Sequence, residues 1–129
     1  MAAGTPDGQR FPRAVRLTRG SEIREVLGKG KRSGTAHLDV FAAASPLSHL
    51  RIGLIVPRYG HSAVERNLVK RRLREAVRRD FIPALARERV TTDIILRARR
   101  NAYGVPYVTL RDELIQLADR RWLREPSSS

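Results

Sequence analysis

Ser62 and Glu65 stand three residues apart at the start of a long helical pattern, the spacing of a capping box. In such a box each side chain bonds the backbone N–H of the other residue, so the helix start is specified locally. The pattern runs to about Phe81, and we expect Pro83 to end the helix. The apolar run at residues 51–56, directly before the box, predicts a buried central strand.

Two further stretches, Thr35–Ala44 and Thr92–Arg99, have the alternation of strands. The first would place apolar side chains on one face of the sheet and a more mixed set on the other. The apolar set is Leu38 and Val40, and the mixed set is His37, Asp39 and Phe41.

Two more helices are expected, one near each end of the chain. Ser21 can cap the first, which carries apolar residues at helical spacing and ends at the turn 28–30. Thr109 with Asp112 repeats the capping logic before the last helix. Its apolar stripe consists of Leu110, Leu114, Leu117, Ala118 and Trp122. Helix, strands, helix, strand and helix together predict an α+β sandwich.

The chain length of 129 residues suits one domain. Residues 1–12 and 125–129 are rich in small, Gly, Pro and Ser residues, and we interpret them as disordered tails around a single domain at 13–124. The sequence contains no long apolar run and no secretory signal, and it has no cysteine. A cytoplasmic protein without disulfides or thiolate zinc sites is therefore expected.

The net charge of +13, from 26 basic and 13 acidic residues, is far more than solubility requires. A polyanionic partner is therefore expected, bound with a steep dependence on salt. Net charge alone does not distinguish RNA, DNA and anionic lipid.

The charge concentrates on the helix that begins at Ser62. At about 100° per residue, one side collects Val69, Leu73, Ala76 and Val77, and the opposite side collects Asn67, Lys70, Arg71, Arg74 and Arg78. Between Arg58 and Arg79 eight basic residues face two acidic ones, whereas an ordinary solvated helix balances them at i,i+4 spacing. The excess of basic residues favours a nucleic-acid contact, because a guanidinium group can bind a phosphate through two hydrogen bonds.

The stretch Ala63–Glu75, AVERNLVKRRLRE, resembles the RNR motif of the bacterial ribonuclease P protein family. The segments at 50–56 and 93–99 resemble the strands that flank this motif. The resemblance covers roughly residues 16–124. It implies an α-β-β-β-α-β-α sandwich with a mixed central sheet and a left-handed βαβ crossover, like the second domain of ribosomal protein S5.

The resemblance also implies a function and a set of site residues. It makes the chain the protein subunit of a ribonucleoprotein endoribonuclease, which binds the catalytic RNA and the 5′ leader of precursor tRNA while the RNA subunit carries out Mg²⁺-dependent hydrolysis. No catalytic or metal-binding residue is expected in the chain. No protein partner is expected either. The RNA-binding residues would be Arg58, Arg66, Asn67, Lys70, Arg71, Arg72, Arg74, Arg78 and Arg99. The cleft for the leader would be lined by Ile23, Leu27 and Phe41.

Three positions depart from the family pattern. Leu68 stands where the family usually has a second arginine, so that contact is either absent or supplied by Arg72. Gly60 lies one position earlier than the usual loop glycine. Ile23 and Leu27 replace aromatic residues of the cleft, so we expect weaker base stacking there and a larger contribution from Phe41.

Several alternatives stay open. A stand-alone RNA-binding module without a catalytic partner is the second candidate, and a DNA-binding regulator is the third. The segment 28–34 is interpreted as a basic turn that touches RNA, and Trp122 as a core residue. Glu65, Glu75 and Asp80 are interpreted as cap and surface charges, not as metal ligands. The three scattered histidines are interpreted as surface or core residues, because none stands at ligand spacing from a carboxylate or a second histidine; they are His37, His49 and His61.

Overall fold

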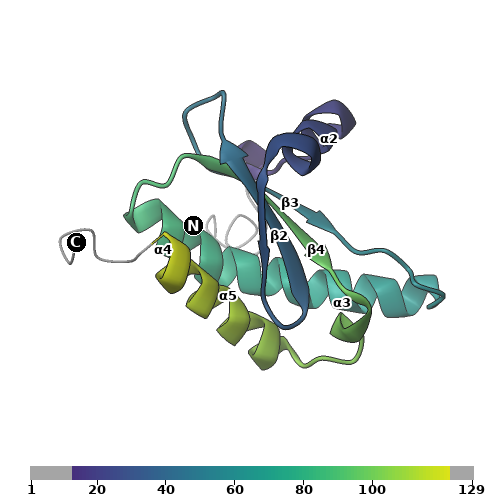
Figure 1. Ribbon diagram of the computed structural model, residues 1–129. Coiled ribbons are helices and arrows are strands. Elements are labelled where there is room, and N and C mark those ends of the chain that lie inside the picture. Colours follow the sequence, from purple (N-terminus) through teal and green to yellow (C-terminus); the bar gives the residue numbers. More distant parts are fainter. Residues whose placement is uncertain (1–12, 123–129) are drawn as a thin grey trace, which may run out of the picture.

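The computed structural model describes residues 13–122 (Figure 1). The tails predicted at 1–12 and 125–129 lie outside the described residues, as do residues 123–124 of the predicted domain. No helix in the described part of the chain is long and apolar enough to span a bilayer.

Four strands form one mixed sheet in the order β1-β2-β4-β3. They are β1 (Lys31–Gly34), β2 (Leu38–Ala44), β3 (Arg51–Ile55) and β4 (Thr92–Ala98). β2 pairs antiparallel with both β1 and β4, whereas β3 pairs parallel with β4. The predicted strands are confirmed, but the pattern missed β1, where we expected a basic turn. β1 pairs on one side with β2 and carries exposed polar residues, so it lacks the apolar alternation of a strand with a buried face.

The helices lie on both faces of the sheet (Figure 1). α2 (Gly20–Lys29) covers one face, while α3 (Ala63–Ala76), α4 (Ile82–Arg87) and α5 (Tyr107–Arg121) cover the other. Short 3₁₀ turns occur at Arg13–Val15 and Arg100–Ala102. The order confirms the α-β-β-β-α-β-α sandwich, and β3-α3-β4 is the βαβ unit for which the resemblance implies a left-handed connection.

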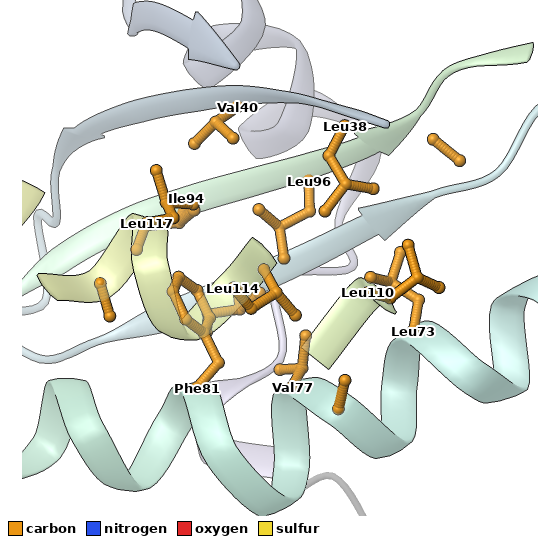
Figure 2. Packing of buried hydrophobic residues seen from close by; sticks show 14 of the residues in the cluster. Leu38, Val40, Leu73, Val77, Phe81, Ile94, Leu96, Leu110, Leu114 and Leu117 are labelled. Carbon is orange, nitrogen blue, oxygen red and sulfur yellow. The ribbon is translucent and has the colours of Figure 1, made fainter. Parts of the chain in front are cut away.

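The larger hydrophobic core lies between the sheet and the helix pair α3 and α5 (Figure 2). Leu73, Val77 and Phe81 point from the long helix toward the strands, and the α5 stripe packs beside them. Each fully buried large side chain contributes roughly 1.5–3 kcal/mol relative to an exposed one. Trp122 is half-buried with its ring edge-on to Phe81, which agrees with its interpretation as a core residue. This core makes the sheet and α3 a single rigid support.

Pro83 does not end the long helix, contrary to the prediction. Residues Val77–Phe81 form a π-helical turn, in which the N–H of Ile82 donates to the carbonyl of Val77 five residues back. Pro83 then lies in the first turn of α4. Proline has no N–H to donate, and its ring would clash with the carbonyl four residues earlier in a regular helix. The wider turn ahead of it lets the helix continue.

Two predicted helix caps are also wrong. α2 begins at Gly20 with Arg19 at the cap position, so Ser21 lies inside the first turn. α5 begins at Tyr107 after Pro106, so Thr109 lies inside its first turn. Pro106 occupies the cap position in an extended conformation and has no side chain that can bond a backbone N–H, so this helix starts without a side-chain cap.

Replacing Ser62 with Ala is expected to lower the free energy of unfolding by about 1 kcal/mol, because the capping box at this residue is confirmed. The Ser62 hydroxyl accepts from the N–H of Glu65 at 3.1 Å, and the Glu65 carboxylate accepts from the N–H of Ser62 at 2.8 Å. Ser21→Ala is the matched control, because Ser21 forms no side-chain hydrogen bond with residues 13–122. Urea denaturation followed by circular dichroism measures both variants, and equal decreases in stability would contradict the assignment.

Candidate nucleic-acid interface

Aromatic side chains hold the loop that leads into α3. The hydroxyl of Tyr103 donates to the carbonyl of Pro57 at 2.6 Å, and that of Tyr59 donates to the carbonyl of Ala98 at 2.9 Å. The ring of His61 stacks on Tyr103 with 3.8 Å between centroids. These contacts tie the loop to the segment after β4. The first turn of α3 is therefore fixed relative to the sheet.

Arg66 anchors the next turn of α3 to the sheet. Its Nε donates to the carbonyl of Val56 at 2.7 Å, just beyond the end of β3. This single bond uses one of the five N–H groups of the guanidinium. The terminal nitrogens make no hydrogen bond within residues 13–122 and can reach a phosphate. Arg66 thus combines an anchoring contact with the capacity to bind an anion.

The basic side chains on the outer side of α3 carry no countercharge from within the described chain. Arg58, Asn67, Arg71 and Arg74 are exposed, and Lys70 is half-buried. Asn67 is neutral, and no carboxylate among residues 13–122 pairs with the other four side chains or with Arg66. Burial lowers the pKa of Lys70, and the neighbouring charges of Arg66 and Arg74 lower it further. This mutual repulsion is the electrostatic signature of a surface that favours an anionic ligand. We call Arg58, Arg66, Asn67, Lys70, Arg71 and Arg74 the α3 basic face.

Arg16 extends this face and was missed by the sequence analysis. The segment before α2 runs beside β3, with the N–H of Leu17 donating to the carbonyl of Ile52 at 2.9 Å. Arg16 therefore lines a hollow of about 240 Å³ together with Lys70 and Arg74. Arg16 precedes Lys70 and Arg74 by more than fifty residues in sequence and belongs to no periodic pattern. Nothing in the sequence therefore indicated that it lies beside them.

Two further predicted RNA-binding residues of the long helix also have partners within the chain. Arg72 donates from Nη1 to the carbonyl of Val105 at 3.1 Å, and so holds the loop before α5. Arg78 forms a two-point ion pair with Glu75, at 2.7 and 3.3 Å, and the same carboxylate pairs with Arg79. Arg72 therefore lies on the α5 side of the helix, away from the α3 basic face, whereas Arg78 follows Arg74 by four residues and is paired with a carboxylate.

The three predicted cleft residues come together on the other face of the sheet. Ile23 and Leu27 of α2 are half-buried and pack against the cluster that contains Phe41 and Ile95. Phe41, however, is 6% exposed, and the guanidinium carbons of Arg32 and Arg97 lie 5.5 and 5.0 Å from its ring centroid. The planar groups that remain accessible beside the cleft are thus mainly the guanidinium groups of these two arginines, and the phenyl ring of Phe41 is largely covered.

Asp39 gathers three arginines next to this cleft. Its carboxylate accepts from Nε of Arg99 at 2.9 Å and from Nη2 of Arg97 at 3.3 Å, and Nη2 of Arg32 lies 3.5 Å away. Burial opposes ionisation of Asp39, but the hydrogen bonds from Arg99 and Arg97 outweigh it and hold its pKa below the usual range. Arg99 was predicted as an RNA-binding residue and Arg32 lies in the segment predicted as a basic turn that touches RNA, whereas Arg97 and Asp39 were missed. We call these four residues the Asp39 cluster.

Two of the three histidines contact a carboxylate. His37 contacts Glu113 through its ring and its backbone N–H, and Thr35 donates to the same carboxylate at 2.6 Å. His61 lies 3.3 Å from Glu65. The first contact clamps the β1–β2 turn to α5 across 76 positions of sequence, a distance that no local pattern spans.

Comparisons with known proteins agree with this geometry. The family model described as Ribonuclease P matches residues 11–122. The ribonuclease P protein component of Syntrophobacter fumaroxidans is 36% identical over 110 residues, covering 84% of this chain and 88% of the relative. The corresponding protein of Vibrio campbellii is 30% identical over 115 residues, covering 88% and 90%.

Solved structures of such proteins share the fold. The Staphylococcus aureus RNase P protein superimposes with a TM-score of 0.72 at 21% identity, covering 88% of this chain and 100% of that one. The RNase P protein of Thermotoga maritima gives 0.69 at 25% identity, covering 81% and 96%. With the family model matching most of its length, the chain belongs to the ribonuclease P protein family, the protein subunits of a ribonucleoprotein endoribonuclease.

Proposed function

We propose that the α3 basic face, extended by Arg16, binds the RNA subunit of ribonuclease P. The observation that carries this proposal is the distribution of the acidic residues. Carboxylates neutralise arginines elsewhere, as Asp93 does for Arg51 and Glu75 for Arg78, yet none within residues 13–122 forms an ion pair with the cations of the first turns of α3. Repulsion between these charges lowers the stability of the free protein. An RNA phosphate backbone neutralises the charges, and the counterions that the RNA releases favour binding.

We assign the opposite face of the sheet to the 5′ leader of precursor tRNA. A single strand exposes both bases and phosphates, and proteins bind it by combining stacking surfaces with a basic groove. Ile23, Leu27 and the edge of Phe41 supply apolar surface under α2, and Arg99 supplies charge beside it. The two RNA surfaces then lie on different faces of the sheet and meet at the hollow beside β3, which Ile23 lines together with Lys70 and Arg74. One protein can thus bind the catalytic RNA and its substrate together.

The chemistry of hydrolysis is assigned to the RNA subunit with its Mg²⁺ ions. The acidic residues that a protein-only nuclease would need are already engaged. Glu65 closes the capping box, Glu75 binds two arginines, and Asp80 accepts from the hydroxyl of Tyr107 at 3.2 Å. They do not converge, and no group of three acidic or histidine side chains in residues 13–122 is arranged to hold a metal ion. The protein would act in the cytoplasm by binding and positioning RNA.

Reconstitution tests the proposed function. The purified protein alone is expected to leave a precursor tRNA intact, and addition of a bacterial ribonuclease P RNA at low Mg²⁺ is expected to give faster removal of the 5′ leader than the RNA alone. The reason is that the protein supplies binding free energy and screens phosphate repulsion between the two RNAs. Cleavage is measured on end-labelled precursor by gel electrophoresis, with the RNA alone as control.

A second candidate function is a stand-alone RNA-binding module. The feature that favours it is the absence of a second arginine at Leu68, where the side chain is 40% exposed and apolar. Tight, salt-dependent RNA binding without any stimulation of cleavage by ribonuclease P RNA would support this alternative and contradict the proposed function.

A further inference from the structure

We propose that Asp39 is a positioning residue, which sets Arg32, Arg97 and Arg99 as a clamp for a phosphodiester of the single-stranded leader. The inference rests on the proposed function, because it assigns the leader to this face of the sheet. It adds residues to that surface, and it gives a role to a carboxylate in a place where a carboxylate would ordinarily repel RNA.

Strand register builds the Asp39 cluster. Asp39 lies at the centre of a cross-strand row, with Gly34 of β1 on one side and Arg97 of β4 on the other. Arg32 and Phe41 are partners in a neighbouring row on the same face. Arg99 follows the end of β4, and its N–H continues the ladder by donating to the carbonyl of His37 at 3.0 Å. The three arginines therefore come from elements that the sheet holds at fixed spacing.

The geometry leaves most guanidinium donors directed away from Asp39. Each guanidinium has five N–H groups. Arg99 uses Nε toward the carboxylate, and Arg97 and Arg32 each approach it through Nη2. The side chain of Asp39 is 11% exposed, whereas those of Arg32, Arg97 and Arg99 are 62%, 31% and 42% exposed. The carboxylate is thus buried beneath a ring of accessible cations.

Gly34 provides the space that this arrangement needs. A Cβ placed on Gly34 would lie 2.6 Å from Nη2 of Arg99 and 3.0 Å from the carbonyl oxygen of Leu38. The guanidinium of Arg99 therefore rests directly on the backbone of β1. The absence of a side chain at Gly34 therefore leaves the space in which Arg99 reaches the carboxylate of Asp39.

The chemistry of the Asp39 cluster fits a phosphodiester. Three positive charges and one negative charge leave a net charge of +2, and guanidinium groups bind phosphate oxygens through paired N–H donors. Arg32 and Arg97 also lie over the ring of Phe41, which holds their planes where an unpaired base can stack. A single strand offers both groups, whereas the bases of a duplex are already stacked.

Asp39→Asn distinguishes positioning from simple electrostatics, because the two predict opposite signs. The variant removes a negative charge, so electrostatics alone predicts tighter RNA binding. Positioning predicts weaker binding, because the neutral amide no longer holds the guanidinium groups in place. Asp119→Asn makes the same change of charge on the exposed surface of α5 and is the matched control.

The experiment measures affinity for precursor tRNAs with a leader of eight nucleotides or one nucleotide, using the holoenzyme assembled with ribonuclease P RNA. We expect Asp39→Asn to reduce the ratio of the long-leader to the short-leader affinity about tenfold, or ~1.4 kcal/mol. Asp119→Asn should leave this ratio unchanged. Gly34→Ala, which keeps every charge but displaces Arg99, should lower the ratio in the same direction as Asp39→Asn. Urea denaturation checks that each variant is folded.

The outcomes separate the two proposals. If the native holoenzyme shows no preference for the long leader, the assignment of this face to the leader is wrong. If that preference is present and Asp39→Asn retains or increases it, the positioning role is overturned. Equal decreases in affinity for both leader lengths would also overturn it, because they would indicate a structural role or a contact with the RNA subunit.

Discussion

The double variant Lys70→Met/Arg74→Met is expected to bind ribonuclease P RNA about a hundredfold more weakly, because each substitution removes a charge-assisted hydrogen bond to phosphate worth roughly 1.5 kcal/mol. Both side chains lie on the α3 basic face and have no carboxylate partner within residues 13–122. The slope of log affinity against log salt should become shallower by about 1.5, because two fewer phosphates are neutralised. Filter binding or fluorescence anisotropy over a range of salt concentrations measures both quantities.

The same variant should be more stable than the native protein in the absence of RNA. Arg66, Lys70 and Arg74 follow one another at i,i+4 spacing, and each such like-charge pair costs roughly 0.2–0.5 kcal/mol. Methionine keeps a high helix propensity, so removing both pairs should raise the free energy of unfolding by about 0.4–1 kcal/mol at low ionic strength. Higher stability combined with weaker binding is the expected signature of a surface organised for a polyanion.

Arg87→Met/Arg89→Met is the matched control, because it removes the same net charge at the end of α4, remote from the first turns of α3 (Figure 1). Both arginines are exposed and have no carboxylate partner within the described residues. This control should change RNA affinity by less than about threefold through the overall field of the protein. Equal decreases in affinity for both double variants would show that net charge, not the α3 basic face, determines binding.

Arg51→Met is expected to lower the free energy of unfolding by about 3–5 kcal/mol, because it leaves a buried carboxylate without its partner. Arg51 and Asp93 are 6% and 3% exposed and are partners in the β3–β4 register. Two hydrogen bonds join them, at 2.9 and 2.7 Å, and the bond from Arg51 to Asp93 is the main reason why the pKa of Arg51 is raised. Arg51 also donates to Glu22 at 3.1 Å, which ties α2 to the sheet.

The double variant Arg51→Met/Asp93→Leu separates the cost of a lone buried charge from the value of the pair. Replacing both partners by apolar residues should restore most of the stability, since no unpaired charge remains. Urea denaturation monitored by circular dichroism measures both variants. A decrease below about 1 kcal/mol for Arg51→Met alone would mean that water reaches Asp93, and it would contradict this account of the pair.

The sequence was informative wherever a structure depends on residues close together in the chain. The capping box at Ser62 and the buried stripes of α3 and α5 are confirmed. Each arises from interactions between residues three or four positions apart, which the order of side chains specifies directly. The same logic failed at Ser21 and Thr109, where the chain enters the helix through other backbone geometry.

The sequence by itself determined the class of fold, the long basic helix and, through its resemblance to a known family, the kind of partner that the helix serves. Tertiary structure alone decided which cations are neutralised and which are not. Arg97 pairs with Asp39 across 58 positions of sequence, while Arg16 was overlooked but joins Lys70 beside the sheet. Asp39 meets Arg99 across 60 positions of sequence. Charges interact through space, and strand register, not position in the chain, sets the distances between them.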